Sequence, residues 1–152
     1  MAAMVGKRIL AIASGGGHFV QLLRLRPGFA GHSVHFASVH PDMASEVIGQ
    51  PYYSFRDVSR ADWWRVPLTL FDLIIILMRV RPQVIVTTGA LPPLIALALV
   101  KPFGVRTLWV DSIANSETLS GSGRLARRIA GTTITQWPQL AEPGVDHWGS
   151  VL

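Results

Sequence analysis

The sequence predicts a single doubly wound α/β domain, in which a parallel sheet carries helices on both faces. Short runs that are apolar throughout alternate with segments of helical spacing, as expected when both faces of a sheet are buried. The 152 residues, 49% of them hydrophobic and 15% charged, can build one core of ordinary size but not two. No residue type forms a tract, which argues against collagen-like and disordered classes. We therefore expect residues 1–152 to form one domain.

Apolar periodicity and the positions of glycine and proline define the expected elements. In chain order these are a strand at 8–13, a glycine turn at 14–17, a helix at 18–26, a strand at 33–38, a short helix at 42–48, a weak extended piece at 52–55, a long helix at 62–81, a strand at 84–87, a helix at 92–100, a strand at 107–110, a short basic helix at 124–130, and a strand at 132–136. Residues 138–152 are expected to form a C-terminal tail.

Ligands of doubly wound folds bind beyond the carboxyl ends of the strands. Four segments that follow predicted strands should therefore meet at one edge of the sheet. They are Ser14 to His18, Thr88 to Ala90, Asp111 to Ser122, and Gln136 with Trp137. This convergence predicts where a functional site lies without any reference to relatives.

The glycine turn leads into a helix, where free N–H groups and the helix dipole favour an anion. Gly15, Gly16 and Gly17 would allow a phosphate to approach the backbone, and His18 at the helix start could act as a general base. Val20 stands where a dinucleotide fingerprint needs its third glycine, and no Gly-Lys-Ser/Thr follows as in a Walker loop. The alternatives are a tight turn without a ligand and a structural histidine.

Asp111 ends a predicted strand in a chain poor in acidic residues, so it is a candidate ligand contact. The alternative is that Asp111 caps a loop. The stretch from Ser120 to Arg124 has the composition of a mobile loop, and Arg124, Arg127 and Arg128 either bind phosphates or solvate a helix face.

The stretch from Val66 to Val80 is apolar on all sides, and tryptophans and arginines stand at its ends, the flanking arginines being Arg56, Arg60, Arg79 and Arg81. As a helix it spans about 22 Å, whereas a bilayer core is about 30 Å thick, so it is too short to cross. Trp63, Trp64, Arg65 and Phe71 fit a helix that lies on an anionic membrane surface. A buried core helix is the alternative.

Composition excludes several kinds of site. Cysteine is absent, so disulfides, thiolate zinc sites and cysteine nucleophiles are excluded. His32 and His35 have no carboxylate near them in sequence, and we expect no metal site. The net charge of +5 favours anionic partners, but the arginines are dispersed and do not predict a nucleic-acid module. The basic start, Met1 to Arg8, shows no secretory signal pattern.

Four motifs together resemble a known family. They are Ala13 to Leu23, Pro82 to Ala90, Trp109 to Ser120, and Thr135 to Leu140. Their order resembles that of PssD-like exopolysaccharide glycosyltransferase subunits. These are similar to the membrane-recruiting subunit of the eukaryotic split N-acetylglucosaminyltransferase, which acts on dolichol-linked sugars.

The resemblance implies the acceptor-side half of a GT-B glycosyltransferase, related to the amino-terminal half of MurG-like enzymes. A PssE-like partner would bind the donor, a UDP-linked nucleotide sugar, and no cofactor is implied. The acceptor would be a polyprenyl-diphosphate-linked glycan at the cytoplasmic face of the inner membrane, where the chain would be peripheral.

The resemblance also assigns roles to residues. His18 and Asp111 would be catalytic, and the acceptor or its phosphates would contact Ser14, Gly15, Gly16, Gly17, Thr88, Gly89, Ser112 and Asn115. Gln136, Trp137 and Trp148 would face the partner, because aromatic residues are enriched at interfaces; the alternative is that this C-terminal tail folds back on its own domain. Two rivals remain: a non-catalytic membrane scaffold, and a stand-alone α/β enzyme that binds a nucleotide without a partner.

Overall fold

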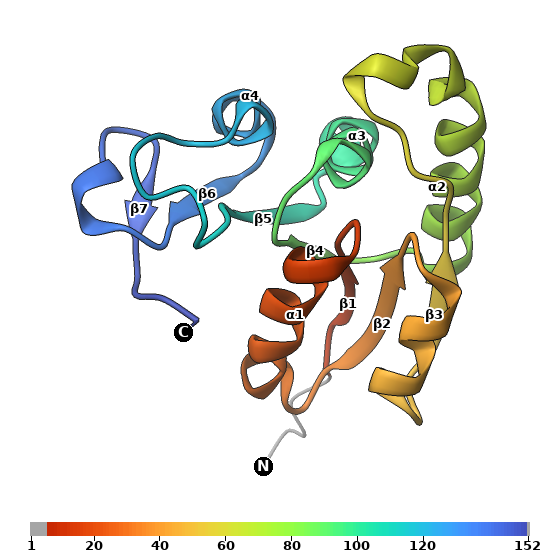
Figure 1. The fold of residues 1–152 in the computed structure, drawn as a ribbon. Coiled ribbons are helices and arrows are strands. Elements are labelled where there is room, and N and C mark those ends of the chain that lie inside the picture. The colour runs from red at the N-terminus through yellow and green to blue at the C-terminus, as the bar shows by residue number, and fades with distance from the viewer. Residues whose placement is uncertain (1–5, 152) are drawn as a thin grey trace.

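The computed structural model describes residues 6–151 and contains a seven-stranded sheet whose neighbouring strands all pair in parallel. The strands are β1 (Arg8–Ile12), β2 (Ser33–Ser38), β3 (Tyr52–Ser54), β4 (Val84–Thr87), β5 (Arg106–Val110), β6 (Thr132–Thr135) and β7 (Asp146–His147). Their spatial order is β3-β2-β1-β4-β5-β6-β7, so the chain builds outward from β1 and then outward from β4 (Figure 1). The predicted Rossmann-like doubly wound class is confirmed.

The described residues form four α-helices and five shorter 3-10 segments. The α-helices are α1 (Gly16–Arg24), α2 (Val66–Val80), α3 (Leu91–Val100) and α4 (Gly121–Ile129), and the 3-10 segments are Arg26–Phe29, Pro41–Val47, Arg60–Arg65, Lys101–Phe103 and Pro138–Leu140. Both α2 and α3 have proline in the first turn, where its missing N–H would have no partner within the helix. Arg81 ends α2 in the left-handed region with φ 47°, and Pro82 follows it.

The sheet separates two apolar cores. Leu10 and Ile12 of β1 point into the core beneath α2, α3 and α4, whereas Ile9 and Ala11 point into the core beneath α1. In Figure 1, α3 and α4 lie on the opposite side of the sheet from α1. Alternate residues of β1 thus serve opposite cores, which explains why the strand is apolar throughout.

Two helical predictions need correction. The long helix expected at 62–81 is divided, because Arg60–Arg65 is a 3-10 segment in which Asp62 has non-helical angles, and the α-helix begins at Val66. The basic helix begins at Gly121, where a mobile loop was expected, because the Ser120 hydroxyl accepts the Gly123 N–H at 2.8 Å and caps α4.

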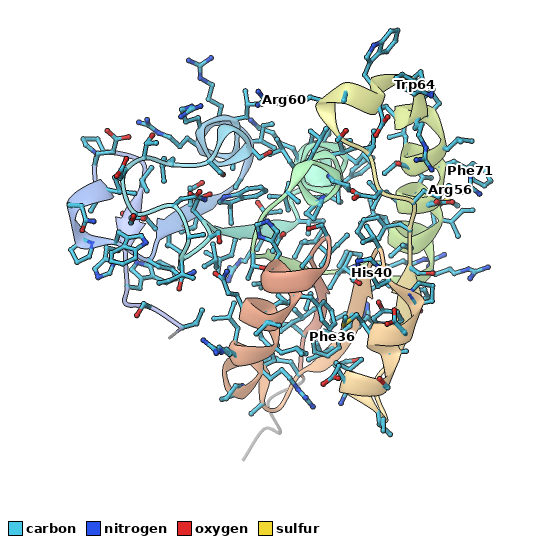
Figure 2. The ribbon with its side chains drawn as sticks, in the orientation of Figure 1. Phe36, His40, Arg56, Arg60, Trp64 and Phe71 are labelled. Atoms are coloured by element: carbon cyan, nitrogen blue, oxygen red, sulfur yellow. The ribbon has the colours of Figure 1, made fainter. Side chains whose placement is uncertain are left out.

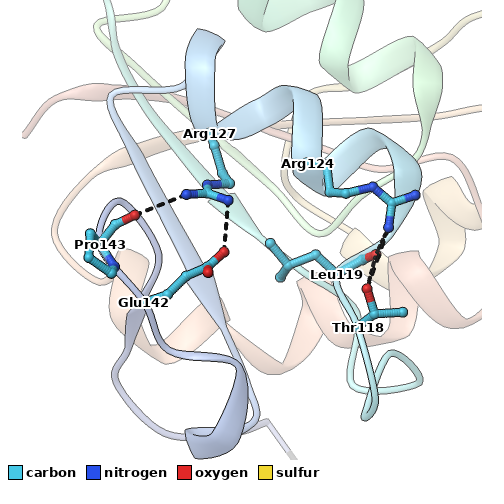
Figure 3. A network of polar contacts seen from close by, with 6 residues as sticks. All are labelled: Thr118, Leu119, Arg124, Arg127, Glu142 and Pro143. Carbon is cyan, nitrogen blue, oxygen red and sulfur yellow. Dashed lines mark hydrogen bonds and ion pairs between the residues drawn. The ribbon is translucent and has the colours of Figure 1, made fainter.

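The C-terminal tail is part of the domain. Asp146 and His147 pair with β6 as the seventh strand. The Arg127 side chain binds Glu142 at 2.7 Å and the Pro143 carbonyl at 3.1 Å, as Figure 3 shows. Arg24 and Gln136 bond the backbone of Val151, at 2.7 and 2.9 Å. Residues 1–5 and Leu152 lie outside the described residues. The prediction of no secretory signal at the start of the chain therefore falls mostly on residues that the structure does not describe.

Candidate functional site

The site is centred where the strand order of the sheet reverses. β1 and β4 are neighbours there, although most of the first half of the domain separates them in sequence. His18, in the first turn of α1, places its Nδ1 atom 2.9 Å from the carbonyl oxygen of Thr88, which follows β4. The Thr88 hydroxyl in turn donates to the His18 carbonyl. The first two of the four predicted segments therefore meet at the switch point, where this fold class binds ligands.

The bond to Thr88 fixes the form of the His18 ring. A carbonyl oxygen only accepts hydrogen bonds, so Nδ1 carries the proton when this bond is made. In the neutral ring the free lone pair is then on Nε2, which is the form a general base needs. The ring packs on Gly89, where an added Cβ would lie 3.0 Å from both Cε1 and Nδ1 of His18. Gly89, at φ +127°, thus leaves the space that the imidazole fills.

Thr88 supports His18 and is not placed to contact a ligand. The sequence assigns Thr88 to the phosphate contacts, but the side chain is fully buried and its hydroxyl is used on the His18 backbone. The Thr87 hydroxyl accepts the Gly89 N–H at 3.2 Å. These contacts together fix the turn after β4.

The glycine turn leaves the start of α1 open. Ser14 and Gly15 are half-buried, and a Cβ on Gly15 would lie 2.8 Å from Nε2 of His40, so this position needs glycine for close approach. Gly16 and Gly17 are exposed, and an added Cβ would meet nothing within 4 Å at either. No side chain of the described residues caps this helix, so its first N–H groups are available to an anion.

Asp111 organises the loop that follows β5. Its side chain is 1% exposed, and Oδ1 accepts from Trp109 Nε1 at 3.1 Å and from the Ser120 hydroxyl at 2.6 Å. Oδ2 accepts from the Ser120 N–H at 3.0 Å and from Asn115 Nδ2 at 3.3 Å. Gly123 permits this packing, because a Cβ there would lie 2.5 Å from Oδ1. The geometry favours the loop-capping alternative over a catalytic role for Asp111.

A buried amide network, which the sequence pattern did not predict, fixes the backbone beside Asp111. Gln21 of α1 donates to the Ser112 hydroxyl at 3.1 Å and accepts from the Ile113 N–H at 3.0 Å. Gln136 donates to Gln21 Oε1 at 2.7 Å and to the Asp111 carbonyl at 3.0 Å. The signal for Gln21 was present, since it is a polar residue on the buried side of α1 between apolar neighbours.

This network changes the expected partner surface. Gln136 is 3% exposed and its amide is used inside the domain, so its side chain cannot face a partner as predicted. Trp137 is half-buried and donates from Nε1 to the Ile113 carbonyl at 2.7 Å. Trp148 remains 64% exposed. Of the three expected interface residues, Trp148 alone presents most of its side chain to solvent.

The edge contains a cavity of about 460 Å³, within the range of small-molecule sites. Its lining comes from His18, Arg60, Gly89, Ala90, Asp111, Ser112, Ala114, Asn115, Ser120, Gly121, Ser122 and Arg124. The lining includes the predicted His18, Gly89, Asp111, Ser112 and Asn115 but not the glycine turn. Arg60 was expected only as a flank of the apolar helix, yet it belongs to the 3-10 segment before α2, where Figure 2 labels it, and it lines the cavity.

The outer face of α2 and the turn before it are apolar and exposed. Trp63, Trp64 and Phe71 are 71%, 61% and 60% exposed, and Arg65 is also exposed. Figure 2 shows Trp64 and Phe71 at the outer edge of the domain. The opposite face of α2, including Leu73 and Ile76, is buried in the core. The helix is thus neither wholly core nor wholly surface. No helix in residues 6–151 is long and apolar enough to span a bilayer.

Comparison with known proteins finds similarity to subunits of a glycosyltransferase. No family model matches the chain. The UDP-N-acetylglucosamine transferase subunit ALG14 of Mus musculus is 25% identical over 179 residues, an alignment covering 89% of this chain and 77% of the mouse protein. The same subunit of Rattus norvegicus is 25% identical over 168 residues, with 88% and 77% covered.

Solved structures share the fold at low sequence identity. MurG of Acinetobacter baumannii superposes with a TM-score of 0.71 at 11% identity, covering 95% of this chain and 46% of MurG. UDP-GlcNAc 2-epimerase of Methanocaldococcus jannaschii superposes with a TM-score of 0.64 at 11% identity, covering 93% and 45%. The chain spans about half the length of these structures. It therefore has the Rossmann-like fold of one half of a GT-B protein and is similar in sequence, over most of its length, to a glycosyltransferase subunit.

Proposed function

We propose that this chain is the acceptor-binding, membrane-associating subunit of a heteromeric, PssD-like glycosyltransferase in polysaccharide biosynthesis. It would act with a PssE-like partner that binds the donor, a UDP-linked sugar, and no metal or cofactor would take part. The acceptor would be a glycan on a polyprenyl diphosphate, at the cytoplasmic face of the inner membrane. The observation that carries the proposal is His18, held through Nδ1 at the switch point of a chain similar to a transferase subunit.

On this proposal His18 is the general base. Its Nε2 atom takes the proton of the acceptor hydroxyl while the hydroxyl oxygen attacks the anomeric carbon of the sugar. The new C–O bond forms as the bond from the anomeric carbon to the phosphate oxygen breaks, and the nucleoside diphosphate leaves with the electron pair. Attack from the face opposite the leaving group inverts the anomeric centre.

The chain's other residues support this step by position. The Thr88 carbonyl keeps the proton on Nδ1, and Gly89 leaves room for the ring. Asp111 holds the cavity wall from Ser112 to Ser120 through its contacts with Asn115 and Ser120. On this proposal the partner would complete the donor site, because a GT-B cleft lies between two such domains.

The test is sugar transfer by the co-purified complex of this chain and its partner, with a radiolabelled nucleotide sugar and a lipid-linked acceptor. His18→Ala should lower turnover by about 10²-fold or more with complex formation retained. His32→Ala is the matched control, because His32 is exposed and lies outside the cavity lining.

Two outcomes oppose the proposal. Near-normal turnover by His18→Ala would remove the base assignment and favour a non-catalytic membrane scaffold that recruits a catalytic partner. Robust transfer by the isolated chain would refute the need for a second subunit.

A further inference from the structure

Two arginines from distant parts of the chain meet at the cavity beside His18. Arg60 belongs to the 3-10 segment before α2, and Arg124 belongs to the first turns of α4, yet both line the same space. Among the described residues, ion pairs are formed by Arg56 with Asp72 and by Arg127 with Glu142. Neither cavity arginine is in these pairs, so both guanidinium charges lack a carboxylate partner in the part of the chain described.

The three arginines of α4 have different surroundings. Arg127 is used on Glu142 and the Pro143 carbonyl, and Arg128 is exposed outside the cavity lining. Arg124 bonds the Leu119 carbonyl at 3.1 Å and the Thr118 hydroxyl at 3.4 Å, both through Nη1 (Figure 3). These bonds hold the side chain in place and leave Nε and Nη2 for a ligand. Of the three arginines, Arg124 is therefore the one whose surroundings favour phosphate contact over a solvated face.

Gly121 determines where the Arg60 guanidinium lies. An added Cβ on Gly121 would lie 2.6 Å from Arg60 Nη2 and 3.4 Å from Cζ, so the group rests against the start of α4. A methyl group there would push the guanidinium aside, and the flexible end of an arginine can move without unfolding the domain. The position of Arg60 can therefore be changed while its charge is kept.

The carboxylate of Asp111 does not act as the counterion of Arg60 and Arg124. Although Asp111 lines the cavity, it is 1% exposed and accepts hydrogen bonds from Trp109, Asn115 and Ser120. Two cations with free N–H groups and one internally bonded carboxylate leave the cavity with an excess of positive charge. Planar guanidinium groups match phosphate oxygens in pairs.

We propose that Arg60 and Arg124 bind the diphosphate group of a substrate next to His18. This inference rests on the proposed function and adds the residues that grip the charged group of the substrate. A diphosphate occurs at two places in that reaction, on the lipid-linked acceptor and on the nucleotide of the donor, and the same two arginines suit either.

The place of Arg60 in the chain favours the lipid-linked source. Arg60 lines the cavity, and Trp63 and Trp64 of the same 3-10 segment are exposed beside the apolar face of α2. If those tryptophans lie in a membrane surface, this one segment joins that surface to the cavity. The diphosphate of a membrane-embedded lipid would lie at this membrane surface, close to the segment that carries Arg60.

The first experiment measures binding of inorganic pyrophosphate to the full chain by isothermal titration calorimetry at low salt. We expect saturable binding that Arg60→Gln and Arg124→Gln each weaken about tenfold, the scale of one charge-assisted contact. Gly121→Ala should also weaken binding, because it displaces Arg60 without removing charge. The controls are Arg128→Gln, which removes an equal charge from the same helix, and Gly28→Ala, where the new Cβ meets nothing within 4 Å.

Two results would overturn the inference. One is the absence of saturable binding. The other is an equal loss of affinity in Arg128→Gln, which would mean that net charge, and not this cavity, attracts the anion.

A second experiment identifies the source of the diphosphate by displacing pyrophosphate with UDP or with farnesyl diphosphate. Displacement by farnesyl diphosphate supports the lipid-linked acceptor, displacement by UDP supports the donor nucleotide, and displacement by neither overturns the inference. Binding is measured without transfer, so the two proposals fail separately. Pyrophosphate binding through both arginines in a complex that transfers no sugar would refute the transferase and keep the anion site.

Discussion

The substitution Asp111→Asn tests whether Asp111 is a structural centre or a catalytic group. The carboxylate accepts from four donors, two on each oxygen. Asparagine keeps the shape but replaces one acceptor oxygen by an NH₂ donor. In either orientation of the amide, its NH₂ group then faces two hydrogen-bond donors and cannot accept from them.

The size of the stability loss depends on which of the four donors can reorient. If the NH₂ takes the Oδ2 position, the Asn115 amide can turn to accept, but the Ser120 N–H is fixed and loses its acceptor. If the NH₂ takes the Oδ1 position, the Ser120 hydroxyl can rotate, but the Trp109 Nε1–H cannot. One fixed, buried donor is left unsatisfied either way, at about 1–3 kcal/mol, and the charge assistance of the remaining bonds is also lost. We expect the free energy of unfolding to fall by about 2–3 kcal/mol.

Urea unfolding of the two proteins measures this difference, and Asp42→Asn is the control because Asp42 is exposed. Ser120→Ala should reproduce much of the loss, since Ser120 supplies two of the contacts through its hydroxyl, to Asp111 and from Gly123. A change below about 0.5 kcal/mol in Asp111→Asn, together with a large loss of transfer, would refute the structural role and restore the catalytic one.

Three further predictions concern the surface and the pH response. Replacing Trp63 and Trp64 by serine should release the chain from anionic liposomes in a flotation assay, and high salt should weaken binding of the native chain; equal flotation of both proteins would contradict this. Burial and the charge of Arg8 lower the pKa of His35 below 6.5, so the unfolded chain protonates first and stability should decrease as the pH falls through and below about 6.5. Urea midpoints across that range check the slope, which His35→Phe should reduce, and an unchanged slope would exclude His35 as its cause. Trp148→Ala should weaken complex formation in size-exclusion chromatography with an unfolding midpoint close to that of the native chain, because the side chain is 64% exposed; an intact complex would remove Trp148 from the interface.

The parts of the fold that were predicted correctly depend on strong local patterns. β1 and β4 are short apolar runs that serve two cores, and this pattern specifies a parallel sheet. The edge rule for such sheets then brings His18 and Thr88 together, and the structure places them in hydrogen-bond contact. Prediction succeeded here because periodicity and topology together determine which segments meet.

The errors occur where a tertiary contact overrides local propensity. Glycines at Gly121 and Gly123 disfavour a helix, yet α4 begins there because Ser120 caps it. Gly123 also makes room for the Asp111 carboxylate, a reason for glycine that no local pattern contains. β7 has only two residues, too few for any period, and it depends on pairing with β6.

Arg60 shows most clearly why position in the sequence does not specify position in a site. In the sequence Arg60 flanks an apolar helix, and this pattern predicts contact with an anionic membrane surface. Asp62, inside the Arg60–Arg65 segment, has non-helical angles, so a kink separates Arg60 from Trp63 and Trp64, and Arg60 lies against Gly121 at the cavity. The segment therefore carries exposed tryptophans after the kink and, before it, a guanidinium that lines the same cavity as His18. On the proposals above, this segment would contact both a membrane surface and a diphosphate, and Gly121→Ala should affect only the second contact.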